Sequence, residues 1–300
     1  MDNEITRTAA PLDSGAIDNA LLCATNKWLQ DRLDRATVGR ALRARHTFAA
    51  TGERLVGLTR CGEHLQGDEF QAKKAVSIDY RFLGNAGWDE IAAYDHTGCI
   101  WRRDLQKEAG YSARHLRIRW GGARIPDRYR WAEWRGTISI LNGTIHGFAG
   151  GGFDNPEESV WRAGPTDIGF RTDTYGDADS AVIDVGNLAG CRIRVAGRID
   201  GYSKTGNPLE RNPFVHCPDF DWEVSGTELL REGGLRRELG GTELFLAIER
   251  VTAAELPREV RGSIDVEPRN GPHGFRPVYF YGRQSDDAKV WTSAMFIAFE

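Results

Sequence analysis

The side chains that could do chemistry in this sequence are few and widely spaced. None of the seven histidines lies in H-x-H, H-x-x-x-H or H-E-x-x-H spacing, the patterns that place two metal ligands on one element. The histidines are His46, His64, His96, His115, His146, His216 and His273. The densest group of ligand atoms is His216-Cys217-Pro218-Asp219-Phe220-Asp221, where an imidazole, a thiol and two carboxylates lie close together. It is the candidate site of a cryptic hydrolase, although a loop packed against Trp222 is the simpler interpretation.

Two further motifs are incomplete. The run Gly150-Gly151-Gly152-Phe153 lacks the G-x-G-x-x-G order and the Gly-Lys-Ser/Thr ending of phosphate-binding loops, which favours a flexible turn. Asp173, Asp177 and Asp179 in D-T-Y-G-D-A-D resemble a calcium loop without the terminal Glu and flanking helices of an EF-hand. An acidic turn is favoured there, with a weak Ca²⁺ site as the alternative. No G-x-S-x-G elbow is present, and the sequence assigns no catalytic, cofactor-binding or metal-binding residue.

Composition narrows the class of protein. Hydrophobic residues make up 40% of the chain and charged residues 27%, which predicts a folded chain with a core. The net charge of −4 gives no electrostatic reason to expect nucleic acid as a partner. No run of about 18 apolar residues occurs, so we expect no membrane partner. The N-terminus lacks an apolar signal segment, and the cysteines are odd in number without C-x-x-C, which favours free thiols and a cytoplasmic location. They are Cys23, Cys61, Cys99, Cys191 and Cys217.

Alternation of apolar and polar residues organises most of the chain. Ala75–Leu83 and His115–Trp120 have a period of two, which is typical of half-buried antiparallel strands. Asn142-Gly143 is a strong two-residue hairpin signal, with Ile145–Phe148 as the returning strand. Further strands are predicted at Arg54–Cys61, Asp89–Tyr94, Cys99–Arg103, Trp131–Ile140, Asp167–Thr172, Ala181–Val185, Cys191–Ala196, Thr242–Val251, Pro277–Arg283 and Val290–Phe299.

The predicted architecture is mainly β, with antiparallel β-sandwich regions preceded by a short helical N-terminal segment. A helix over Asp34–Arg45 is expected to turn Val38, Ala41 and Leu42 inward, and Thr51-Gly52 to turn the chain into the first strand. We expect a helical segment over 1–47, a first sandwich part over 48–122 and a second over 123–300. The tryptophans of these strands are expected to anchor cores, above all Trp134, but any exposed ones would be able to stack on sugars. They are Trp101, Trp120, Trp131, Trp134 and Trp161.

The stretch Leu33–Leu55 resembles a segment of the PHP-like family, named after the polymerase and histidinol phosphatase superfamily. The matching residues are Leu33, Arg35, Ala41, Leu42, Arg45, Thr47, Thr51, Gly52 and Arg54. Later elements are similar to that family in the same order: Gly67, Arg119-Trp120-Gly121-Gly122-Ala123, Trp134-x-Gly136, Thr174-Tyr175-Gly176-Asp177-x-Asp179, and Tyr279–Ile297 with Trp291-Thr292-Ser293. Ala288 and Ala294 depart from the family's Gly and Pro. The resemblance covers about residues 30–298.

The resemblance implies a large bacterial family of metal-dependent, phosphoesterase-like hydrolases, of which this chain would be the C-terminal β region. The family's divalent metal is held by His- and Asp-rich motifs of a β/α barrel, and residues 1–32 contain no His. We therefore expect no cofactor in this chain and an accessory, non-catalytic role. The partner would be a separately encoded barrel, or a second copy of this chain, docked through the 34–45 helix. The alternative is an independent ligand- or carbohydrate-binding sandwich that uses exposed Trp residues and the loop 204–219.

Overall fold

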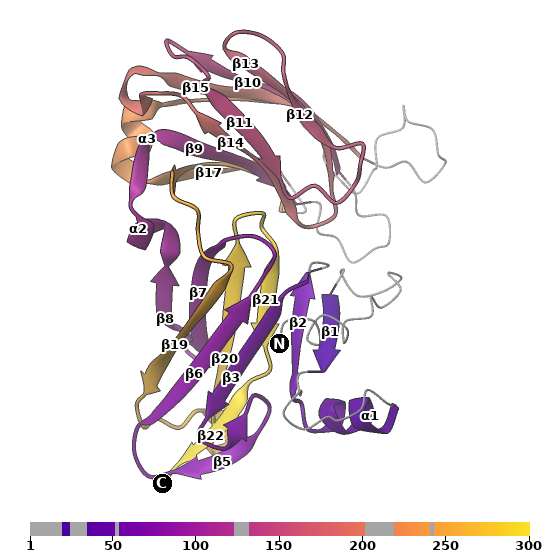
Figure 1. The fold of residues 1–300 in the computed structure, drawn as a ribbon, viewed down its shortest axis with the longest axis vertical. Coiled ribbons are helices and arrows are strands. Elements are labelled where there is room, and N and C mark those ends of the chain that lie inside the picture. The colour runs from indigo at the N-terminus through magenta and orange to yellow at the C-terminus, as the bar shows by residue number, and fades with distance from the viewer. Residues whose placement is uncertain (1–19, 25–34, 52–53, 123–131, 202–218, 241–242) are drawn as a thin grey trace. The chain divides into compact units, whose positions relative to one another are not determined.

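A computed structural model describes residues 20–24, 35–51, 54–122, 132–201, 219–240 and 243–300 (Figure 1). The chain forms two compact units: unit 1 is Met1–Glu108 with Glu255–Glu300, and unit 2 is Ala109–Ala254. This division differs from the expected boundaries at 47 and 122. The difference arises because the last strands of the chain pair with strands of its first third. Local sequence patterns do not show such long-range pairing.

Unit 1 contains an eight-stranded and a four-stranded sheet. The larger sheet has the order β1-β2-β21-β20-β22-β5, with β7 and β8 added through β20, and the smaller has the order β19-β6-β3-β4. All pairs are antiparallel except β22 with β5. The elements are β1 (Ala20–Ala24), α1 (Arg35–Arg43), β2 (Thr47–Thr51), β3 (Val56–Cys61), β4 (His64–Leu65), β5 (Glu69–Ala72), β6 (Val76–Leu83), β7 (Trp88–Asp95), β8 (Gly98–Asp104), α2 (Leu105–Ala109), β19 (Glu259–Val266), η4 (Pro272–Gly274), β20 (Arg276–Gln284), β21 (Lys289–Thr292) and β22 (Met295–Phe299).

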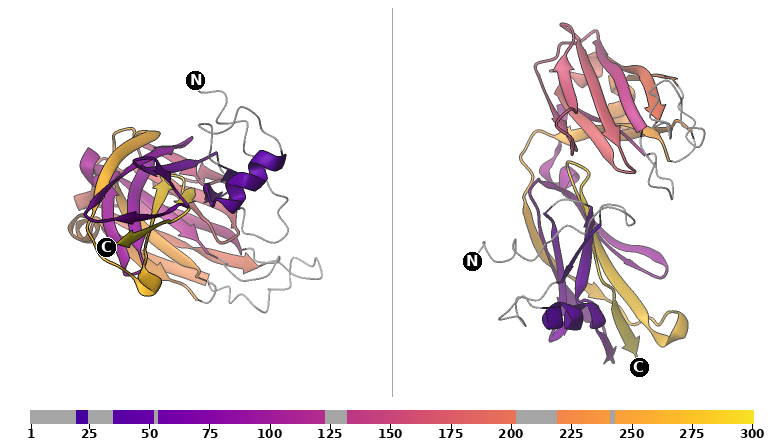
Figure 2. Two further views of the ribbon diagram at one scale, coloured as in Figure 1. Left: turned by 90° about the horizontal axis from the view of Figure 1, so that it is seen from below. Right: turned by 90° about the vertical axis from the view of Figure 1, so that its right-hand side faces the viewer.

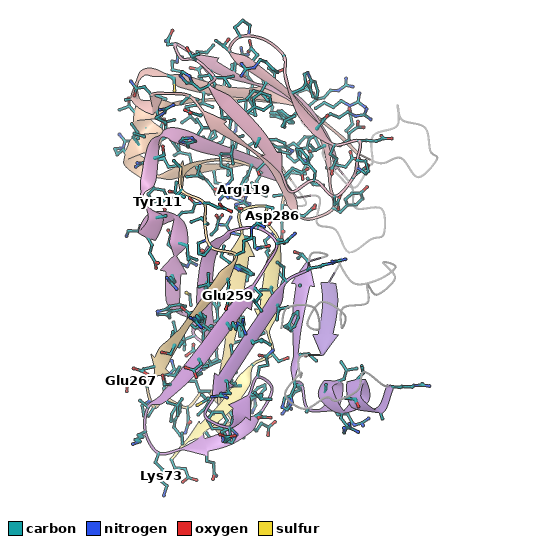
Figure 3. The ribbon with its side chains drawn as sticks, viewed as in Figure 1. Lys73, Tyr111, Arg119, Glu259, Glu267 and Asp286 are labelled. Carbon is teal, nitrogen blue, oxygen red and sulfur yellow. The ribbon has the colours of Figure 1, made fainter. Side chains whose placement is uncertain are left out.

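Strand β6 of unit 1 has one face buried in the core and one face exposed. Ile78, Tyr80 and Phe82 are buried, whereas the intervening polar residues are exposed, as the alternation predicts. The buried side chains join one core with residues of β7 and β20, among them Trp88 and Phe280. Figure 3 marks the neighbouring strand β19 by Glu259, its first residue. The predicted half-buried strand at Ala75–Leu83 is therefore confirmed.

Helix α1 matches the predicted helix, and the conformation of Arg45 ends it. Arg45 adopts φ 59°, a left-handed conformation that terminates a helix. Its Nε donates to the Gly67 carbonyl at 3.0 Å and its terminal nitrogen to Glu69 at 2.8 Å. Gly67 has φ 96°, and a Cβ there would overlap the Arg45 carbonyl group. The end of the helix is thus fixed to the segment before β5 by the backbone of Gly67.

Unit 2 is a β-sandwich of two five-stranded antiparallel sheets, visible as two facing layers in Figures 1 and 2. One sheet has the order β12-β13-β10-β15-β16 and the other β11-β14-β9-β18-β17. In Figure 3, Tyr111 marks the start of β9 and Arg119 lies near its end. The elements are β9 (Tyr111–Gly121), β10 (Ala132–Leu141), β11 (Gly147–Gly151), β12 (Ser159–Arg162), β13 (Asp167–Thr174), β14 (Ala178–Asp184), η3 (Leu188–Gly190), β15 (Arg192–Gly201), β16 (Asp219–Ser225), α3 (Gly226–Glu232), β17 (Gly234–Glu238) and β18 (Phe245–Thr252).

Aromatic side chains from both sheets fill the core of unit 2. Trp120 of β9 stacks on Phe170 of β13 with ring centroids 4.3 Å apart. Its indole Nε1 donates to Thr172 Oγ1 at 2.7 Å, and Trp134 Nε1 donates to Thr174 Oγ1 at 2.9 Å. A buried indole needs such an acceptor, because an unpaired N–H away from water destabilises the fold. The expected mainly β, antiparallel architecture with a short helix near the N-terminus is confirmed.

The hairpin predicted at Asn142-Gly143 is wrong. Strand β10 pairs with β13 and β15, whereas the following strand β11 pairs with β14 in the other sheet. The chain therefore crosses between the two layers at this turn. Asn142 does adopt the left-handed conformation that the signal implies, with φ 57°. The sequence therefore predicts the conformation of the turn, but Ile145 packs in the core of the sandwich and not in a hairpin.

Candidate functional site

The described residues among those singled out for metal or nucleophile chemistry do not converge on one site. Within the described ranges, no group of three or more His, Cys, Asp or Glu side chains is arranged to hold a metal ion. His46 Nε2 lies 2.7 Å from Asp68 Oδ1, and the His64 ring stacks on Phe70 with centroids 4.2 Å apart. Both contacts hold turns of unit 1 together. Of the cysteines, Cys61 and Cys191 are buried free thiols and Cys99 is an exposed one.

The densest ligand group of the sequence is only partly described. His216 and Cys217 lie outside the described residues, whereas Asp219 and Asp221 lie on β16 with exposed side chains. Asp221 accepts two bonds from the Arg194 guanidinium, at 2.8 and 2.6 Å. The hydrogen bond and charge of Arg194 lower the pKa of Asp221. Asp221 is therefore part of a cross-strand ion pair, and the cryptic hydrolase remains a prediction.

A hollow of about 480 Å³ opens on unit 2 beside the turns that follow β10 and β14. Arg114 in its wall donates to Asp184 at 3.3 and 2.9 Å. Asn187 caps η3 by accepting from the Ala189 N–H. The lining residues are Arg114, Asn142, Gly143, Thr144, His146, Val185, Gly186, Asn187 and Gly190. Several of these polar groups hold the turns in place, so the hollow alone indicates no ligand class.

The described tryptophans among those singled out from the sequence differ in burial. Trp120 and Trp134 are fully buried, which confirms the expected core role of Trp134. Trp101 is half-buried against the core of unit 1. Trp131 lies outside the described residues. Trp161 differs from the rest, because 47% of its surface is exposed.

The Trp161 indole lies against Gly169 of strand β13, on the outer face of its sheet. It is on the edge strand β12, opposite Gly169, and a Cβ at Gly169 would overlap the indole. The absent side chain of Gly169 therefore allows the indole to approach the β13 backbone, and 47% of the Trp161 surface stays exposed. Both residues are visible in the sequence, but only the strand register shows that Gly169 lies opposite Trp161.

Small side chains continue the row that begins at Trp161. Gly169 of β13 is opposite Thr137 of β10, which is opposite Ala196 of β15. Three strand spacings make this row about 14 Å wide. The result is a shallow strip across the sheet with an aromatic platform at one edge. We call the row Trp161, Gly169, Thr137 and Ala196 the Trp161 strip.

A row of arginines borders the Trp161 strip. Arg171, Arg135 and Arg198 lie opposite one another on β13, β10 and β15, two residues along from the strip, or about 7 Å away. Their side chains are 50%, 43% and 56% exposed. Glu133 accepts from Arg171 Nε at 2.9 Å and from Arg135 Nε at 2.7 Å. The strip is thus flanked by ordered, solvent-facing hydrogen-bond donors and acceptors.

The predicted acidic turn connects two strands. Asp173 lies on β13, Asp177 in the turn and Asp179 on β14. Asp177 Oδ1 accepts from the Tyr175 N–H at 2.6 Å. Burial, followed by the charge of Asp173, raises the pKa of Tyr175 to about 12. The turn therefore concentrates negative charge at one end of the unit 2 sandwich.

Sequence reasoning missed a buried carboxylate beside this turn. Glu158 Oε2 accepts from the N–H groups of Asp154 and Asn155, both at 2.8 Å, and its Oε1 accepts from the Asp173 N–H at 2.7 Å. Three backbone N–H groups therefore satisfy the two oxygens of this buried side chain. Glu158 ties the loop before β12 to β13. The sequence signal was only an acidic stretch, D-N-P-E-E, with nothing to say which carboxylate faces inward.

Comparisons with known proteins add little to this geometry. No family model and no curated protein matches the chain. Among solved structures, the N-terminal periplasmic domain of ScsB from Proteus mirabilis is similar at 8% identity, over 85% of this chain and 94% of that one, with a TM-score of 0.14. A likeness this weak carries no argument. Across the described ranges, no helix has the length and apolarity needed to cross a membrane.

Proposed function

We propose that unit 2 is a carbohydrate-binding sandwich whose ligand stacks on Trp161. The observation that carries the proposal is the position of this indole against Gly169, with nearly half of its surface exposed. The apolar face of a sugar ring packs on an exposed aromatic ring, and neighbouring charged groups orient its hydroxyls. Arg171, Arg135 and Glu133 supply such groups beside the strip. The proposal assigns a specific site to the carbohydrate-binding sandwich that the sequence leaves open as the alternative.

Replacing Trp161 by alanine is expected to remove glycan binding and leave the fold intact. The full chain is applied to a glycan array, and the strongest glycan is then titrated by calorimetry. We expect at least a tenfold loss of affinity in Trp161→Ala and an intermediate loss in Trp161→Phe. Tyr175→Ala is the matched control, because Tyr175 is 38% exposed and lies outside the strip. Equal binding by Trp161→Ala and the unmodified protein would reject the proposal.

We also propose a second function, an accessory role for the chain beside a PHP-like hydrolase. Leu42 of α1 favours it, because this side chain is 50% exposed whereas Thr37 and Ala41 are buried. The expected inward position of Leu42 is therefore wrong, since the helix rests on its other side. The exposed leucine between Arg40 and Arg43 is an apolar contact with a basic rim. Its partner would be the separately encoded, metal-binding barrel that the family resemblance implies, in the cytoplasm, or a second copy of this chain.

Changing Leu42 to glutamate is expected to abolish such docking without changing thermal stability. Co-expression with a barrel-encoding neighbour tests the first partner, and sedimentation velocity of the chain alone tests self-association. Leu141→Glu is the matched control, because Leu141 is 36% exposed and lies on unit 2. Retention of the complex by Leu42→Glu, or its loss in Leu141→Glu, would exclude the 34–45 helix as the docking element.

A further inference from the structure

Three arginines form a continuous row on the outer face of one sheet of unit 2. Arg135 of β10 lies directly opposite Arg171 of β13 on one side and Arg198 of β15 on the other. Like charges directly opposite each other on neighbouring strands destabilise a sheet. The pairing of the strands therefore does not account for a row of three positive side chains.

Carboxylates balance the arginines only from the side away from the Trp161 strip. Glu133 accepts from Arg171 Nε at 2.9 Å and from Arg135 Nε at 2.7 Å. Glu133 is opposite both Asp173 and Asp200, so the row beyond the arginines carries only carboxylates on these three strands. The sheet thus has a band of positive charge next to the strip and a band of negative charge beyond it.

Distance decides which of the two bands acts on a ligand of the strip. Along each strand the arginine row is two residues from the strip, or about 7 Å, and the carboxylate row is four residues away, or about 13 Å. Exposed charges are largely screened beyond about 8 Å at physiological ionic strength. An anionic group on the strip therefore interacts more strongly with the arginines than with the carboxylates.

The other borders of the strip carry charges of both signs. On β13 and β15, the row on the other side of the strip holds Asp167 and Arg194. On β16 the strip meets Asp221, which is paired with Arg194. Negative charge on a ligand is therefore best accommodated at the opposite end of the strip, between Trp161 and Arg171.

We propose that the glycan bound by unit 2 is acidic, with a sugar ring on Trp161 and its carboxylate or sulfate group on Arg171 and Arg135. The inference rests on the carbohydrate function proposed above and names the class of its ligand. A guanidinium has five N–H donors in a planar fork that matches the paired oxygens of an anionic group. Arg171 donates to Glu133 through Nε and is 50% exposed, so its fork keeps donors for a ligand.

A glycan array that carries uronic-acid and sulfated glycans beside their neutral counterparts tests the proposal. We expect the acidic glycans to give the strongest signals, and the best of them to bind the full chain about tenfold more tightly than its neutral counterpart in solution. Arg171→Gln and Arg135→Gln should each remove most of this difference. Arg192→Gln is the matched control and should keep it, because Arg192 is 57% exposed on the same face of β15 but lies four residues from Ala196 of the strip.

The results distinguish this inference from the carbohydrate function on which it rests. If neutral and acidic glycans bind equally well, and Trp161→Ala abolishes binding whereas Arg171→Gln does not, the carbohydrate function stands and the acidic ligand is rejected. If acidic glycans bind equally well to Trp161→Ala but not to Arg171→Gln, the arginine row binds polyanions and both proposals fail. An array without any bound glycan also rejects both.

Discussion

Replacing Trp134 by alanine is expected to lower the unfolding free energy of unit 2 by about 3–5 kcal/mol. The side chain is fully buried, its ring packs near Phe220 with centroids 5.8 Å apart, and its Nε1 donates to Thr174. The variant therefore leaves a cavity, and the Thr174 hydroxyl keeps only its 3.4 Å hydrogen bond to the Gly122 carbonyl. Each unit has its own core, so calorimetry should show one transition displaced and the other unchanged.

Trp161→Ala is the matched control for this prediction. It removes the same side chain from the same sheet, but from an exposed position, so its effect on unfolding is expected to stay below about 1 kcal/mol. Equal destabilisation by the two substitutions would contradict the assignment of Trp134 to the core. A displacement of both transitions by Trp134→Ala would contradict the independence of the two units.

Replacing Arg276 by alanine is expected to lower the unfolding free energy of unit 1 by about 3–5 kcal/mol. Arg276 Nε lies 2.9 Å from Asp95 Oδ2, and the two side chains are 8% and 0% exposed. Without the guanidinium, Asp95 becomes a buried charge without its ion-pair partner. The control is Arg81→Ala, which breaks a pair with Glu259 whose side chains are 48% and 45% exposed. That loss should be under about 1 kcal/mol, and urea denaturation measures both.

The same pair predicts how acid affects unit 1. Burial raises the pKa of Asp95, but hydrogen bonds from the Thr97 hydroxyl and N–H and from Arg276 outweigh it, so the pKa lies below its usual range. A lowered carboxyl pKa stabilises the fold above the unfolded value of about 3.9, and this stabilisation is lost as pH falls through the folded value. Denaturation between pH 3 and 7 should show a smaller acid loss in Arg276→Ala. An unchanged pH dependence would contradict this role.

Local patterns predicted local structure well. The alternation in Ala75–Leu83 is visible within nine residues and predicts strand β6 with its buried face. The division into units was not predictable in this way, because it depends on the pairing of Tyr279 with Tyr94, far apart in the chain. Strands β16 and β17 are not among the predicted strands. In β16 the apolar residues Phe220, Trp222 and Val224 do alternate with acids, so its period was present in the sequence.

The candidate sites were even less accessible to sequence reasoning. Trp134 and Trp161 are the same residue type in similar strand contexts, and only the sheet order separates the central strand β10 from the edge strand β12. Asp179 was noticed as one of three carboxylates in a turn. Its burial follows from the register with Trp120, which no short motif encodes. Burial and register are properties of pairing, so the chemistry they create appears only in three dimensions.

The pairing of Thr252 with Tyr111 has one more consequence. These residues lie close to the two ends of unit 2, and opposed residues of an antiparallel pair are about 5 Å apart. The segment Ala109–Ala254 thus leaves and re-enters the chain of unit 1 at almost one point. Unit 2 is therefore a domain inserted into the chain of unit 1. Domain insertion is tolerated where the two ends of the inserted domain lie close together. A short linker from Glu108 to Glu255 would join the two segments of unit 1 into one continuous domain.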